Sequence, residues 1–117
     1  MKRDLGLIRN ILLEIEELDE DGSHSLQIQG YSNAEILYNV SLLVDEGYIK
    51  GKATREMLYL ESLSWSGHDL LDSMRDKNVW AKLRRAIDDT VGSVSLETVK
   101  RLGVALTEQY LKDRLGL

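Results

Sequence analysis

The sequence contains no cysteine, which excludes disulfide bonds and zinc sites built from thiolates. It also lacks an apolar run of the length that a membrane-spanning helix needs. The N-terminal residues do not lead into the apolar segment that is typical of a secretory signal. These absences predict a cytoplasmic protein that does not contact a membrane.

Motifs that carry catalysis or hold a cofactor are also missing. No phosphate-binding loop, metal-ligand cluster or nucleophile motif occurs. His68 has carboxylates nearby in Asp69 and Asp72, but no activated serine accompanies them. The acidic turn at residues 19–21, beside His24, lacks the spacing and the distal glutamate of a calcium-binding loop. We therefore expect no enzymatic activity, no metal and no cofactor.

Positive charge is in short supply. The chain has 15 lysines and arginines against 20 aspartates and glutamates, a net charge of −5 at pH 7. This balance disfavours strong nonspecific binding of nucleic acid, because that affinity comes from neutralised phosphates. A local basic face is still compatible with the sequence, either as a solvated surface or as a contact for phosphate or an acidic partner. The most basic stretch contains Arg75, Lys77, Lys82, Arg84 and Arg85.

Length and composition predict one folded domain. A chain of 117 residues can bury one hydrophobic core. Hydrophobic residues make up 43% and charged residues 30%, which is ordinary for a globular protein. Within this single domain we expect a core over residues 1–77, with a C-terminal helical extension, residues 78–117, packed on it.

The central part of the chain, residues 32–65, is typical of a helix followed by a β-hairpin. Ser32 or Asn33 can cap the helix, and Gly47 can end it. Tyr38 and Asn39 are expected on the outer, solvent-facing side of this helix. The apolar stripe that defines the inner side consists of Ile36, Leu37, Val40, Leu43 and Val44.

A charged turn connects the two strands of the predicted hairpin. Residues 50–56 are expected to form the turn, and residues 57–65 the returning strand. The turn contains the cations Lys50, Lys52 and Arg55. Charged side chains at such a tip often only protect a sheet edge, whereas the tip of a winged helix contacts phosphate. Both roles remain open from the sequence.

The remaining segments add helices and one short strand. Periodicity predicts helices at residues 2–18, 67–76 and 78–90 and a last one after Ser95, with Ser66 and Asn78 as further caps. Alternation over residues 26–29 predicts a strand that pairs with the hairpin. The fold class is therefore α+β, mainly α: a winged helix-turn-helix with a small antiparallel β-sheet and additional C-terminal helices. The segment before the central helix has no room for the full helix that a winged helix usually carries there.

Several stretches resemble a small family of bacterial and phage-borne proteins that is classed as a domain of unknown function. The opening stretch is Lys2-Arg3-Asp4-Leu5, followed by Leu7-Ile8-Arg9, and the central one is Gly47-Tyr48-Ile49. The later stretch, LSWSGHDLLD, runs over residues 63–72, and Trp80 follows it. The resemblance spans nearly the whole chain. It implies a winged-helix-like fold, no established activity and no catalytic residues.

Two functions of different classes fit this reading. The first is a phage-type DNA-binding or transcription-regulatory protein that binds double-stranded DNA, in which Asn39 of the central helix pairs with adenine. The second is a protein-interaction module that binds a phage or host protein without contacting DNA, favoured by Leu42 beside Tyr38 on the outer helix side. In either case the C-terminal helices can pair two copies into a homodimer. The candidate nucleic-acid-binding residues are Asn33, Tyr38, Asn39, Lys50, Lys52 and Arg55.

Overall fold

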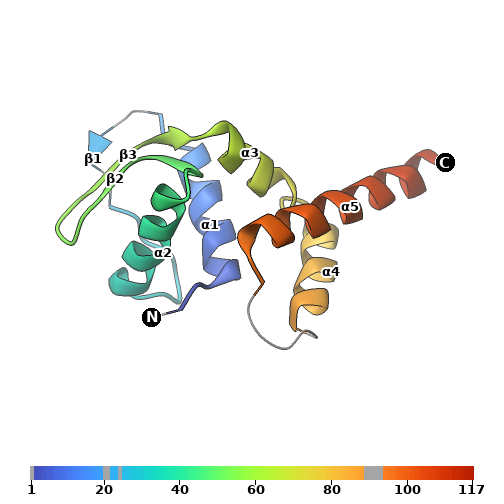
Figure 1. The fold of residues 1–117 in the computed structure, drawn as a ribbon, viewed down its shortest axis with the longest axis horizontal. Helices are drawn as coiled ribbons and strands as arrows, with labels where there is room; N and C mark the ends of the chain where they lie inside the picture. The colour runs from blue at the N-terminus through green and yellow to red at the C-terminus, as the bar shows by residue number, and fades with distance from the viewer. Residues whose placement is uncertain (1, 20–21, 24, 89–93) are drawn as a thin grey trace. The chain divides into compact units, whose positions relative to one another are not determined.

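The computed structural model describes every residue of the chain except 1, 20–21, 24 and 89–93. The chain divides into two compact units, Met1–His68 and Asp69–Leu117, drawn together in Figure 1. The predicted boundary lay later, between residues 77 and 78, and the packing of the C-terminal helices on the earlier part stays a prediction. None of the described helices is long and apolar enough to cross a membrane.

The first unit combines helices with a small antiparallel sheet, in which β3 lies between β1 and β2. Helix α1 packs against α2 and β3, and α2 leads directly into β2 (Figure 1). These features confirm the predicted α+β, mainly α class. The elements are α1 (Leu5–Glu16), β1 (Gly22–Ser23), α2 (Asn33–Asp45), β2 (Ile49–Ala53), β3 (Leu58–Leu63) and α3 (Trp65–Asp72), which continues into the second unit.

Helix α1 begins at a capping carboxylate. The Asp4 side chain accepts a hydrogen bond from the backbone N–H of Leu7 at 2.9 Å, which satisfies one of the free amides of the first turn. A broad apolar face of this helix is buried, as the periodicity predicted. Its buried residues are Leu7, Ile8, Ile11, Leu12 and Ile15.

Helix α2 begins and ends close to the predicted positions. The Ser32 hydroxyl accepts from the backbone N–H of Glu35 at 3.1 Å, and the Glu35 carboxylate accepts from the backbone N–H of Ser32 at 3.1 Å. This reciprocal capping box holds the first turn. Gly47, just after the helix, has a φ of +80°, a conformation that favours glycine. The predicted inner stripe is confirmed at Ile36, Val40 and Leu43, which are buried.

The short strand lies earlier in the chain than predicted. Gly22 pairs with Leu60 and Ser23 with Tyr59, both antiparallel. Residues 26–29 are not in a strand, so that prediction was wrong. Alternation of apolar and polar residues reports burial, whereas a strand needs a partner for its backbone groups. Among the described residues of this segment, those that pair with β3 are Gly22 and Ser23.

Strands β2 and β3 form the predicted hairpin, with a bulge. Lys50 lies opposite Ser62 and Lys52 opposite Tyr59, and the register shifts between Lys50 and Gly51. Gly51 has a φ of +152°, and a Cβ there would lie 2.3 Å from the Tyr59 carbonyl oxygen, so a side chain does not fit. The two lysines belong to β2 and not to the turn, which spans residues 54–57.

Ser64 joins β3 to α3 and ties this junction to the end of α2. Its Oγ donates to the Gly47 carbonyl at 2.5 Å and accepts from the backbone N–H of Gly67 at 3.0 Å. A Cβ at Gly67 would lie 2.0 Å from the Tyr48 carbonyl oxygen, so the chains approach closely here. The cap of α3 is therefore Ser64, and the predicted cap, Ser66, was wrong because the hairpin ends earlier than expected.

The described residues of the second unit form helices. Helices α4 (Lys77–Asp88) and α5 (Leu96–Leu115) pack against each other. The Asp76 carboxylate caps α4 by accepting from the backbone N–H groups of Asn78 and Val79 at 2.8 and 3.0 Å; the predicted cap, Asn78, is already inside the helix. Ser95 caps α5 as predicted, accepting from the backbone N–H of Thr98 at 3.1 Å. The predicted end of the fourth helix, at residue 90, lies outside the described residues.

Candidate functional site

Asn39 lies inside the protein, so the prediction that it faces solvent was wrong. The residue is 1% exposed. Its Oδ1 accepts from the backbone N–H of Asp4 at 3.0 Å, and its Nδ2 donates to the Glu35 carbonyl at 2.9 Å. Both ends of the amide are therefore used within the fold, and Asn39 cannot read the edge of a base.

The exposed surface of α2 is acidic. The helix contains no lysine or arginine, whereas Glu35, Asp45 and the adjacent Glu46 are exposed. Tyr38 is half-buried, which leaves only part of its ring accessible. Because carboxylates repel phosphate, this charge pattern disfavours insertion of α2 into a DNA groove.

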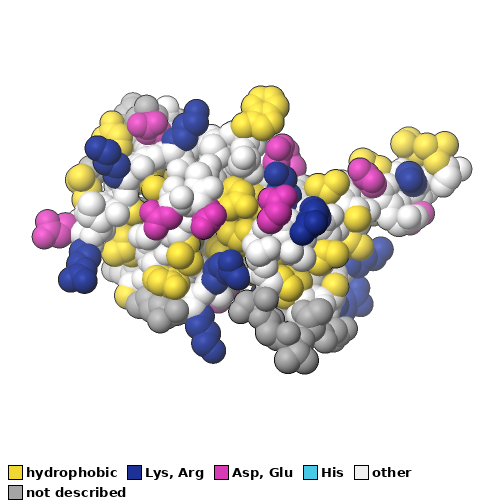
Figure 2. Space-filling view, viewed as in Figure 1, with side chains coloured by type: hydrophobic (Ala, Val, Ile, Leu, Met, Phe, Trp, Pro, Cys, Tyr) yellow, Lys and Arg dark blue, Asp and Glu magenta, His cyan; other side chains and the backbone are white. Residues whose placement is uncertain are grey.

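The predicted hairpin cations are exposed but lie among acids. Lys50 and Lys52 are on β2, and Arg55 is in the turn. Glu56 and Glu61 are exposed on the same hairpin, and Figure 2 shows side chains of both signs around it. The hairpin therefore offers scattered positive charges, without a purely basic surface.

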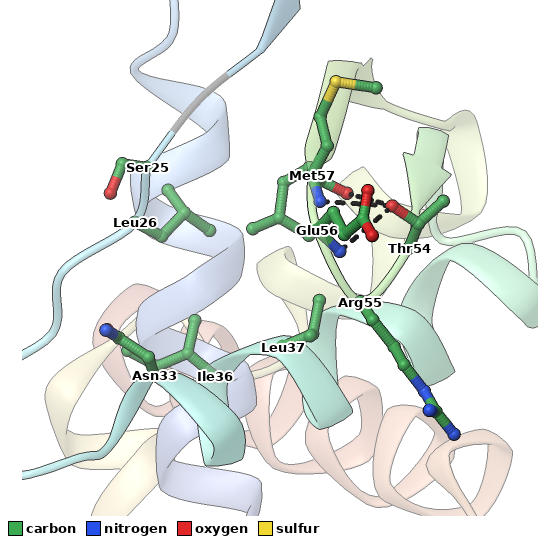
Figure 3. Close-up of a pocket in the computed structure, with 10 residues that line it drawn as sticks. Ser25, Leu26, Asn33, Ile36, Leu37, Thr54, Arg55, Glu56 and Met57 are labelled. Carbon is green, nitrogen blue, oxygen red and sulfur yellow. Dashed lines mark hydrogen bonds between the residues drawn. The ribbon is translucent and has the colours of Figure 1, made fainter.

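A groove lies between the first half of α2 and the hairpin turn (Figure 3). It encloses about 460 Å³. The side chains of Leu26, Ile36 and Leu37 extend into it, whereas the guanidinium of Arg55 points away. Its floor is therefore apolar and its rim polar. The complete lining is Ser25, Leu26, Asn33, Ile36, Leu37, Thr54, Arg55, Glu56, Met57 and Leu58.

The turn that borders this groove is held in place by Thr54. The backbone N–H of Thr54 donates to the Met57 carbonyl at 2.9 Å. Its Oγ1 accepts from the backbone N–H of Met57 at 3.1 Å and from that of Glu56 at 3.3 Å. The bonds to Thr54 Oγ1, dashed in Figure 3, hold the turn at the edge of the groove.

Met57 lines a second hollow as well as the groove. This hollow encloses about 450 Å³ and is lined by Gly51, Lys52, Met57, Tyr59 and Glu61. Met57 is 49% exposed and Tyr59 39% exposed. Methionine is flexible and polarisable, which suits it to contact varied apolar partners. Met57 was predicted as the first residue of the returning strand, but it lies in the turn before β3, and its exposure was not predicted.

Trp65 is a second residue that sequence reasoning missed. It was assigned to the returning strand, but it is the first residue of α3 and is 83% exposed. Its neighbours Ser64 and Gly67 have structural roles at the junction, described above. The available signal was helical phase: Trp65 falls outside the stripe of Leu70, Leu71 and Met74, all of which are buried.

His68 makes a structural contact. Its Nδ1 lies 3.9 Å from Oε2 of Glu16, and half of its side chain is accessible. This distance suits a weak contact between α1 and α3. Across the part of the chain that the structure describes, no group of three or more histidine, aspartate or glutamate side chains is placed to hold a metal ion.

Comparison with known proteins finds relatives without an assigned activity. The family described as "Hypothetical protein (DUF2513)" matches residues 2–94. A protein of Haemophilus influenzae described as "Uncharacterized protein" is 32% identical over 117 aligned positions, which cover 95% of this chain and 99% of the relative. No solved structure matches the chain.

Proposed function

Since the chain belongs to the DUF2513 family, whose description states no activity, we propose a function from its own surface: the first unit is a winged-helix-like module that binds a protein. Its order α1-β1-α2-β2-β3, with β3 central, corresponds to a winged helix that has lost the helix before α2. The resemblance to phage-borne proteins makes a phage or host protein the expected partner.

The observation that carries this proposal is the apolar groove beside an acidic helix. Leu26, Ile36, Leu37, Met57 and Leu58 line it, and pockets of this kind accept the apolar anchor of a partner protein. The Thr54 hydrogen bonds preorganise its wall, which lowers the entropy lost on binding.

The charge of the first unit supports a protein partner over DNA. Residues 1–68 contain six lysines and arginines against twelve aspartates and glutamates, a formal charge of −6. Affinity for nucleic acid rises with the number of phosphates that cations neutralise. A unit with this excess of acids is poorly suited to that role.

The experiment is quantitative affinity capture with the tagged full chain from a lysate of its source cells. Met57→Glu places a charge at the groove edge, and Leu37→Gln removes an apolar contact from its lining. We expect a protein retained by the wild type to be reduced at least about tenfold by either change, as for an interface anchor. Circular dichroism verifies that both variants fold.

Leu102→Glu is the matched control. Leu102 is exposed to a similar extent as Met57, 40% against 49%, but it lies on α5, outside the groove. Capture should match that of the wild type. If the groove variants and the wild type retain the same proteins in equal amounts, the groove is not the binding site.

A second candidate is the DNA-binding regulator, which the exposed hairpin cations Lys50, Lys52 and Arg55 favour. In this candidate, Asn33 and Tyr38 remain possible DNA-contacting residues, whereas Asn39 does not, because it is buried. An electrophoretic shift with mixed duplex DNA at several salt concentrations tests it. Salt-sensitive retardation that Lys52→Glu with Arg55→Glu abolishes would favour this candidate, and no retardation at low salt would eliminate it.

A homodimer through the C-terminal helices is the remaining part of the proposal. The last turns of α5 extend past α4 (Figure 1), and several apolar side chains on α5 and just after it are exposed. These are Val104, Leu111, Leu115 and Leu117.

A further inference from the structure

Helix α4 presents a basic face. It contains four cations and one acid, Asp88, which is its last residue. Lys77, Lys82 and Arg85 are exposed, and Figure 2 shows lysine and arginine side chains gathered beside this helix. Positions 78 and 82, and positions 82 and 85, are neighbours on a helix surface, so Asn78 adds a polar group next to these charges. The charged face extends about 12 Å along the helix axis, at 1.5 Å per residue.

The cations of this face are not neutralised within the described part of the chain. Among the acidic side chains that the structure describes, which do not include that of Asp88, none forms an ion pair with Lys77, Lys82 or Arg85. The guanidinium carbon of Arg84 lies 5.4 Å from the ring centre of Trp80, which holds a fourth charge at the edge of the face by a cation–π contact. The opposite side of α4 is apolar and buried through Val79 and Leu83.

We propose that this face of α4 binds the phosphate backbone of a nucleic acid duplex, without preference for sequence. Four cations on one helix complement the regularly spaced phosphates of a duplex, and lysine and arginine contact phosphate without reading bases. The placement also agrees with the distribution of charge. The second unit contains nine cations and eight acids, whereas the first unit has a formal charge of −6.

This inference goes beyond the protein-binding groove of the first unit. It assigns nucleic-acid contact to α4 and not to α2, which contains no cation. The two sites lie on different units, so an experiment can contradict one proposal without contradicting the other.

Fluorescence anisotropy of the full-length protein with labelled mixed-sequence duplexes, one of DNA and one of RNA, tests the proposal. Titrations at several salt concentrations from about 50 to about 200 mM give the dependence of the binding constant on salt. The variant Lys82→Glu with Arg85→Glu should bind at least about tenfold more weakly at the lowest salt. Its slope of log K against log salt should be shallower by about 2, one unit for each lost phosphate contact.

The matched control is Arg101→Glu with Lys112→Glu, which makes the same change of charge at two exposed positions of α5. It should lose much less affinity, because only the long-range field changes. Met57→Glu, in the groove, should bind like the wild type.

The proposal is overturned if neither duplex binds at the lowest salt, or if the α4 and α5 variants lose affinity equally. Polyglutamate and vesicles that contain anionic lipid are measured in parallel. If either binds as tightly as the duplexes and depends equally on Lys82 and Arg85, the partner is an acidic protein or a membrane surface, and the nucleic-acid assignment is wrong. Circular dichroism of each variant establishes that α4 is still folded.

Discussion

Asn39 joins two parts of the first unit that lie far apart in the sequence. Its amide accepts from the backbone N–H of Asp4, 35 positions earlier, at 3.0 Å. Asp4 itself caps α1 through Leu7. A buried polar group is tolerated only when it is hydrogen-bonded, and here the bonds orient the start of α1 against α2.

We therefore predict that Asn39→Ala destabilises the protein by about 1–3 kcal/mol, the usual effect of leaving a buried donor without a partner. Urea denaturation followed by circular dichroism measures the change. Asn33→Ala is the control; because Asn33 is exposed, its effect should stay within about 0.5 kcal/mol. Equal effects of the two changes would contradict the structural role of Asn39.

The two tryptophans differ in environment. Trp65 is 83% exposed, whereas Trp80 is half-buried and has Arg84 over its ring. Acrylamide should quench the fluorescence of Trp80→Phe, which retains only Trp65, more strongly than that of Trp65→Phe. Trp65→Ala should leave the free energy of unfolding within about 0.5 kcal/mol of the wild type. Weak quenching of Trp65 would show that another part of the protein, or a second copy, covers it.

At the scale of elements, close backbone approach decides how α5 packs. Gly103 is buried on this helix, and a Cβ there would lie 2.1 Å from the Ser73 carbonyl oxygen and 2.8 Å from the Ser73 Cβ. Glycine is thus required by packing, even though it weakens a helix by roughly 1 kcal/mol relative to alanine.

Gly103→Ala should therefore destabilise the protein by about 1–3 kcal/mol, because overpacking exceeds the gain in helix propensity. The control is the reverse change on the exposed side, Ala105→Gly, which should cost about 1 kcal/mol from propensity alone. Thermal and urea unfolding measure both. A more stable Gly103→Ala variant would mean that α5 does not lie this close to Ser73.

The hairpin is the other element whose geometry supports the proposed function. Gly51 permits the bulge in β2, and Thr54 closes the turn. Thr54 lines the groove and Gly51 lines the second hollow, and Met57, which borders both, is 49% exposed. A rigid hairpin with one adaptable methionine suits recognition of an apolar anchor.

At the scale of the whole molecule, the two units differ in net charge. The acids are spread evenly, whereas nine of the 15 cations fall in the 49 residues of the second unit, 69–117. The exposed apolar residues Val104, Leu111 and Leu115 of α5 recur at steps of seven and four, which places them on one helix face.

We expect this face to pair two copies of the chain. Sedimentation velocity at several concentrations should show a concentration-dependent dimer for the wild type. Leu111→Glu with Leu115→Glu should give a monomer, since it places charges in the apolar contact. Leu102→Glu, on another side of α5, should keep the dimer. A wild type that stays monomeric at all concentrations would contradict this expectation.

Local sequence patterns were enough to predict the helices and the hairpin, but not the short strand β1. The stripe of Ile36, Val40 and Leu43 and the stop at Gly47 locate α2 and the start of the hairpin, and Ser95 marks the start of α5. These features are local. The apolar residues of a buried helix face recur every three or four positions, and a helix cap contacts backbone groups only a few residues away. The fold class followed from them, and so did the exposure of the hairpin cations.

Tertiary structure alone decided which polar residues are available for function. Asn39 lies three residues after Ile36, on the buried side of α2, but its polar side chain led to the prediction that it faces solvent. The backbone N–H of Asp4 donates a hydrogen bond to it, and this bond permits its burial. Gly22 and Ser23 are a strand only because β3 lies beside them, and the exposure of Met57 and Trp65 follows from where the hairpin ends. The partner of Asn39 and the pairing of β1 depend on contacts between residues far apart in the sequence, which a local pattern does not identify.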